Sequence, residues 1–135
     1  MKNKKNSKKA NAGTVMRNKF ANAARGIKVV LKEESTLIFY LISIIIVVGL
    51  SIWLKINTVE WSILVLTIGV VLGFEFVNTS IENLVDLLSF EYNIKAKKIK
   101  DIGAAASIIN AIISFAIGFL ILLPPFIEQI NKYLS

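Results

Sequence analysis

The chain has 135 residues, with 16 basic and 9 acidic side chains and a net charge of +7. The absence of Cys and His excludes disulfide scaffolds, Cys/His zinc sites, thiol nucleophiles and histidine acid–base chemistry. The hydrophobic share is 55% and the mean hydropathy +0.65, which is too apolar for a soluble domain because a short chain has little interior. Composition therefore favours a small, basic integral membrane protein whose chemistry depends on carboxylates, amides and lysines.

The N-terminal segment carries ten of the basic residues before residue 33, with no acid among them. Residues 1–14 are polar and low in complexity, and this composition predicts a disordered basic tail. No basic surface interleaved with aromatic residues follows, so we expect the tail to lie near anionic lipid head groups and expect no nucleic-acid partner.

Residues 15–34 have apolar side chains at helical spacing, with basic residues and Asn toward the other side. The apolar positions include Met16, Phe20, Ile27 and Leu31. This pattern predicts an amphipathic helix lying in the membrane surface, although an ordinary partner helix would give the same pattern.

Three apolar segments follow, and their lengths predict three transmembrane helices at about 37–54, 61–88 and 102–127. The third is expected to end near Pro124 and Pro125, because proline interrupts helical hydrogen bonding. The sequence therefore predicts an all-α integral membrane protein made of a surface helix and three spans, with residues 15–135 as one membrane domain.

The loops differ in positive charge, which predicts the orientation in the membrane. The N-terminal segment and the second loop are rich in lysine, whereas the first loop and the C-terminal tail are nearly neutral. We expect the N-terminus and the second loop in the cytoplasm and the C-terminus outside the cytoplasmic membrane.

Four polar residues fall on one face of the second span. With Glu75 at zero and about 100° per residue, Asn78 lies at about −60°, Glu82 at about −20° and Asp86 at about +20°. An ionisable group inside a membrane helix costs at least about 2.5–3.5 kcal/mol, so an aligned set indicates a functional site, a contact between helices or an ion pathway.

The depth of this stripe favours a site at the inner boundary. If Trp61 marks the outer interface, Glu75 lies about 21 Å deeper. Glu82 then falls near the inner boundary and Asp86 in the cytosolic head-group zone. A lipid alcohol dissolved in the membrane would meet a soluble phosphate donor there.

Residues 74–107 read FEFVNTSIENLVDLLSFEYNIKAKKIKDIGAAAS. This string resembles the signature of the prokaryotic diacylglycerol kinase family, E-x-x-N-[TS]-[AS]-I-E-x-x-V-D, in which K-D-x-[GA]-[AS]-A-A begins fourteen positions after the final Asp. The resemblance extends from residue 25 to the end of the third span. It implies a homotrimeric lipid kinase that uses ATP and Mg²⁺.

The resemblance also implies a role for each matching residue. Glu75 matches the general base on the lipid hydroxyl, Glu34 and Glu82 match the ligands of the metal and nucleotide, and Asn78 and Asp86 match polar residues that shape the site. The remaining matches are nucleotide contacts at Glu91, Tyr92, Lys100 and Asp101. Asn22, just before the stretch that resembles the family, aligns with a further nucleotide contact.

The function expected from these observations is transfer of the γ-phosphate of ATP to a membrane lipid alcohol. The stretch AKKIKD and the ILLPP ending favour the undecaprenol kinase branch of the family over diacylglycerol kinases, which make phosphatidic acid. Two functions of other classes also fit a polar stripe, namely a small channel or transporter subunit and a non-catalytic assembly protein.

Overall fold

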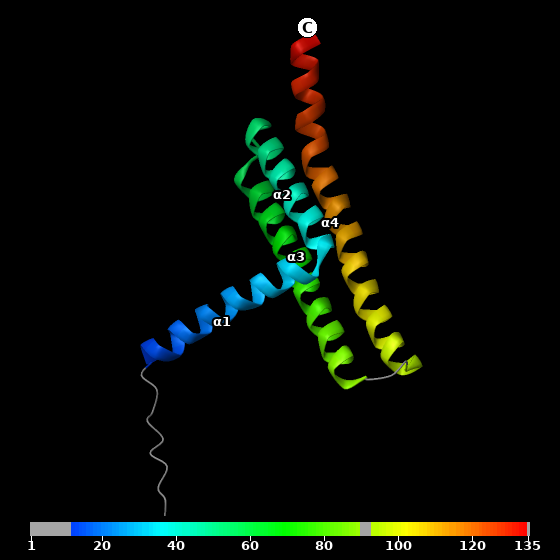
Figure 1. The fold of residues 1–135 in the computed structure, drawn as a ribbon. Coiled ribbons are helices and arrows are strands. Elements are labelled where there is room, and N and C mark those ends of the chain that lie inside the picture. Colours follow the sequence, from blue (N-terminus) through cyan, green and yellow to red (C-terminus); the bar gives the residue numbers. More distant parts are fainter. Residues whose placement is uncertain (1–11, 90–92, 135) are drawn as a thin grey trace, which may run out of the picture. The chain divides into compact units, whose positions relative to one another are not determined.

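The computed structural model describes residues 12–89 and 93–134, and within these ranges it contains four helices (Figure 1). They are α1 (Ala12–Glu33), α2 (Ser35–Trp53), α3 (Thr58–Leu88) and α4 (Ile94–Leu134). The all-α prediction is confirmed. Glu91, Tyr92 and the first eleven residues of the predicted tail lie outside the described residues.

Helix α1 forms a unit by itself, separate from the unit that starts at Glu34. It begins at Ala12, so residues 12–14 are helical although the sequence placed them in the tail. Met16 and Phe20 are exposed apolar residues of this helix, and Arg25 donates a side-chain hydrogen bond to Asn22 one turn earlier. The location of α1 in the membrane surface stays a prediction.

Helices α2 and α3 are joined by a short turn that fixes where α3 begins. Asn57 caps α3 by accepting hydrogen bonds from the backbone of Val59 and Glu60, and Glu60 accepts one in return from the Asn57 backbone. This reciprocal arrangement satisfies amides that the first helical turn leaves open. Lys55 in the turn has a φ of 54°, a left-handed conformation in which a side chain is strained.

Helix α4 is longer than the sequence predicted. It continues through Pro124 and Pro125 to Leu134, so the expectation that the prolines end the helix was wrong. Each proline removes one amide donor, but a membrane helix tolerates this where neighbouring groups compensate. The 41 residues of α4 measure about 61 Å at 1.5 Å per residue, about twice the hydrocarbon thickness.

The chain is a multi-pass membrane protein with three candidate spans, which are α2, α3 and α4 in the part of the chain that the structure describes. Helices α3 and α4 pack along one another, whereas α2 contacts both more sparsely (Figure 1). A small apolar core of Ile56, Leu64 and Ile121 lies near the turn between α2 and α3. Many large apolar side chains on all three helices remain exposed, which is expected of surfaces that meet lipid or other subunits.

Candidate active site

The polar face predicted for α3 passes from buried to exposed along the helix. Glu75 is only 5% exposed and Asn78 8%, Glu82 is half-buried, and the Asp86 carboxylate is 64% exposed. This gradient follows the predicted direction from the membrane interior toward the second loop. Burial of a carboxylate is costly, so the position of Glu75 is one that a purely structural helix would avoid.

The surroundings of Glu75 come from three helices. Glu34 and Glu82 are near enough to interact electrostatically with its carboxyl group, and the Ser107 hydroxyl of α4 lies close to it. The Ser107 hydroxyl donates its hydrogen bond to the Phe74 carbonyl at 3.3 Å, which ties α4 to α3 beside Glu75. The predicted base and both predicted metal ligands are therefore neighbours in the structure.

Asn78 connects this cluster to Gly103 on α4. Its amide Nδ2 donates to Glu82 Oε1 at 3.0 Å, whereas its Oδ1 is buried without a hydrogen-bond partner. A Cβ placed on Gly103 would lie 2.5 Å from that oxygen. A side chain at residue 103 would therefore require the Asn78 amide to shift.

Glu34 lies at the N-terminal end of α2, where it is the N-cap residue with an extended backbone. Its side chain makes no capping hydrogen bond and is half-buried. A carboxylate is favourable near the positive, N-terminal end of a helix. At this end of α2, the Glu34 carboxylate is near enough to interact with Glu75 of α3.

The acidic groups suit a metal that also binds phosphate. Among residues 12–89 and 93–134, no three acidic side chains are grouped closely enough to hold an ion by themselves. Mg²⁺ is commonly held by one or two carboxylates together with water and substrate phosphates. The Glu34 and Glu82 carboxylates therefore fit Mg²⁺ that arrives with a nucleotide.

A second polar region lies where α3 ends and α4 begins. Lys100 Nζ contacts both oxygens of Asp86, at 2.9 and 3.1 Å, and so joins the two helices across the loop. Around this ion pair is a polar pocket of about 450 Å³ whose lining includes Lys97 and Asp101. Asp86, predicted to shape the site, thus acts as the partner of Lys100, which was predicted to contact the nucleotide.

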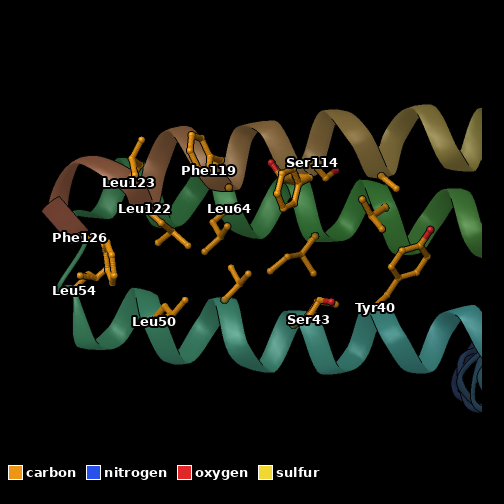
Figure 2. Close-up of a pocket in the computed structure, with 18 residues that line it drawn as sticks. Tyr40, Ser43, Leu50, Leu54, Leu64, Ser114, Phe119, Leu122, Leu123 and Phe126 are labelled. Atoms are coloured by element: carbon orange, nitrogen blue, oxygen red, sulfur yellow. The ribbon is translucent and has the colours of Figure 1, made fainter.

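An apolar cavity of about 540 Å³ lies between α2, α3 and α4 (Figure 2). It runs from Tyr40 at one end to Leu54 and Phe126 at the other, where Trp53 and Phe126 pack edge to face with ring centroids 6.3 Å apart. Tyr40 is near enough to Glu75 for an electrostatic interaction. The Tyr40 end of the cavity is therefore near the buried carboxylate.

The structure brings together most of the residues that the sequence singled out. Asn22 lies on α1, which is described separately, and Glu91 and Tyr92 fall outside the described residues. Sequence reasoning missed Tyr40, Gly103 and Ser107 as parts of the site. The spacing of four residues between Gly103 and Ser107 puts both on one face of α4, a signal that points to a common neighbour on α3.

Comparison with known proteins connects this geometry to a family. Residues 21–122 match the family described as prokaryotic diacylglycerol kinase. An undecaprenol kinase of Bacillus subtilis is 35% identical over 105 residues, which cover 78% of this chain and 85% of that protein. A diacylglycerol kinase of Helicobacter pylori is 33% identical over 87 residues, which cover 64% of this chain and 68% of that protein.

Proposed function

We propose that this chain, which belongs to the prokaryotic diacylglycerol kinase family, transfers phosphate to undecaprenol. Membership makes the chain a membrane lipid kinase. The longer and slightly more identical match to the undecaprenol kinase supports the choice of acceptor over diacylglycerol. Diacylglycerol is the second candidate, because two relatives with that activity in their names also match.

The observation that carries the proposal is that Tyr40, which lines one end of the apolar cavity, lies near the buried Glu75 carboxylate. A lipid chain lying between α2, α3 and α4 would bring its hydroxyl to the carboxylate. Glu75 would accept the hydroxyl proton as the alcohol oxygen bonds to the γ-phosphorus, and the bond from that phosphorus to ADP would break.

The polar groups on the loop side of Glu75 suit the nucleotide. Lys100 and the polar pocket around it supply positive charge for phosphates, and Asp86 holds the Lys100 ammonium in place. Glu34 and Glu82 would hold Mg²⁺ bound to ATP, and the ion would neutralise charge on the transferring phosphate. Asn78 keeps the Glu82 carboxylate oriented through its amide.

The proposal also includes a topology and an assembly. The lysine-rich second loop supports a cytoplasmic location for the nucleotide pocket and for the N-terminus, with the C-terminus outside. The assembly is the homotrimer that the family resemblance implies, in which other copies would cover part of the apolar faces that the three spans expose.

The test is phosphate transfer from ATP by the purified protein in mixed micelles that contain undecaprenol or diacylglycerol at equal mole fraction. We expect faster transfer to undecaprenol, and loss of transfer when Mg²⁺ is removed with a chelator and recovery when it is restored. Faster transfer to diacylglycerol would make diacylglycerol the main candidate acceptor and undecaprenol the second. Absence of transfer to either lipid, from protein shown to be folded, would contradict both.

A further inference from the structure

The apolar cavity ends one helical turn short of the polar cluster on two of its three helices. Val71 is the cavity residue of α3 nearest to Glu75 in the sequence, and Ala111 is the cavity residue of α4 nearest to Ser107. Each pair is four residues apart, which places its members on one face of a helix and about 6 Å apart along the axis. Both helices therefore pass from the apolar lining to the polar cluster within a single turn.

Tyr40 marks the same boundary on the third helix. It is the first residue of α2 that lines the cavity, and its hydroxyl is directed away from α2 toward the helices opposite (Figure 2). Glu75 is near enough to Tyr40 for an electrostatic interaction. A phenol can donate one hydrogen bond, yet within residues 12–89 and 93–134 the structure has no hydrogen bond at the Tyr40 hydroxyl.

The other hydroxyl groups of the cavity are already bonded or lie farther from the polar cluster. Ser43 and Thr67 donate to carbonyls of their own helices. Ser114 is seven residues, or about 10 Å along α4, from Ser107. A donor that faces apolar space is unfavourable until a ligand supplies an acceptor for it. The Tyr40 phenol is therefore the donor that a polar group at this end of the cavity would meet.

We propose that Tyr40 is an acceptor-binding residue whose phenol hydroxyl donates a hydrogen bond to the oxygen of the acceptor alcohol. This inference rests on the proposed function, in which Glu75 accepts the proton of the same alcohol. An alcohol oxygen has one hydrogen and two lone pairs. The hydrogen would point to Glu75, and one lone pair would accept from Tyr40. The second lone pair would then be free to attack the phosphorus.

Tyr40→Phe tests the contact because it removes one oxygen and keeps the ring. A neutral hydrogen bond changes binding by about 2–10-fold, so we expect the KM for undecaprenol to rise about five-fold. The KM for ATP should stay constant, because the proposed nucleotide pocket lies at the second loop. Diacylglycerol is also an alcohol, so its KM should rise by the same factor if it is the preferred acceptor.

Ser114→Ala is the matched control, because it also removes a cavity hydroxyl without a hydrogen bond among the described residues. We expect it to change the KM for the lipid less than about two-fold, since Ser114 is too far along α4 to reach the acceptor oxygen. An equal rise in both variants would overturn the proposal. A Tyr40→Phe protein with a lower kcat and an unchanged KM for the lipid would also overturn it, because the phenol would then act on Glu75.

A prenyl hydrocarbon that lacks the hydroxyl separates the hydrogen bond from the packing of the ring. Used as a competitive inhibitor, it offers no oxygen to Tyr40, so the wild type and Tyr40→Phe should be inhibited at the same concentration. If Tyr40→Phe needed about five-fold more hydrocarbon than the wild type, the effect would lie in packing and the proposal would be wrong.

Binding of undecaprenol without ATP, followed by native mass spectrometry, distinguishes this inference from the proposed function. Weaker retention of undecaprenol by Tyr40→Phe than by the wild type, together with no phosphate transfer by the wild type, would support the contact and contradict the kinase assignment. Equal retention by both proteins, together with normal transfer by the wild type, would overturn the contact and leave the kinase assignment intact.

Discussion

The two ends of the helical unit that starts at Glu34 are built differently. Toward the turn between α2 and α3, the three helices surround a cavity of about 540 Å³ with an apolar lining (Figure 2). Toward the second loop, α3 and α4 meet through directional contacts, such as Ser107 with the Phe74 carbonyl and Lys100 with Asp86. Apolar contacts tolerate small displacements, whereas the polar contacts depend on individual atoms. The first end suits a variable lipid chain and the second suits a fixed reaction.

The largest difference between the ends should appear when a carboxylate on α3 is neutralised. Glu75→Gln removes the proposed base, and we expect the rate of phosphate transfer to fall at least about 100-fold. Glu60→Gln is the matched control at the other end of the same helix, where glutamine can still cap. Rates in mixed micelles measure both. If the Glu75→Gln protein transferred phosphate as fast as the control, Glu75 would not be the general base.

Filling the cavity should have an intermediate effect that is confined to the lipid. Gly118 lines the cavity, and Gly118→Leu would place a bulky side chain in it. Overpacking an apolar site costs about 1–3 kcal/mol, so we expect the KM for the lipid to rise about ten-fold while the KM for ATP stays constant. Gly69→Leu, at an exposed glycine outside the cavity lining, is the control. An equal rise in the KM for the lipid and the KM for ATP would show that the cavity does not bind the lipid acceptor specifically.

The smallest effect is expected at the exposed ion pair near the second loop. Lys100→Gln removes a phosphate partner, and because exposed charges are screened we expect the KM for ATP to rise only about five-fold. The increase should shrink as the ionic strength of the assay is raised. Lys132→Gln breaks a similar exposed pair with Glu128 near the other end of α4, and it should leave the KM for ATP unchanged. A Lys100→Gln enzyme with the wild-type KM would place the nucleotide elsewhere.

The helical spans, and the residues that share one face of a span, were predictable from the sequence because both depend only on the spacing of residues along one helix. The apolar runs predicted the three spans, and rotation by about 100° per residue placed Glu75, Asn78 and Glu82 on one face. The continuation of α4 beyond Pro124 was missed, because the rule that proline ends a helix ignores a neighbouring apolar environment.

Contacts between helices could not be predicted in the same way. The approach of Gly103 to Asn78 depends on how α3 and α4 rotate against each other, which helical periodicity does not fix. The location of Tyr40 near Glu75 depends likewise on where α2 packs. The resemblance to a family named the polar residues, but it did not say which of them contact one another.

The cavity has a consequence for how the protein selects its substrate. Its lining includes the hydroxyl groups of Tyr40, Ser43, Thr67 and Ser114, and those of Ser43 and Thr67 already donate to carbonyls of their own helices. Few polar groups are left to distinguish one hydrocarbon chain from another, and apolar pockets discriminate analogues only weakly, by about 1–3 kcal/mol per methylene. If the acceptor tail occupies this cavity, its selection depends on the cavity volume, and we expect substitutions that widen or shorten the cavity to shift the preference of the enzyme from one membrane alcohol to another.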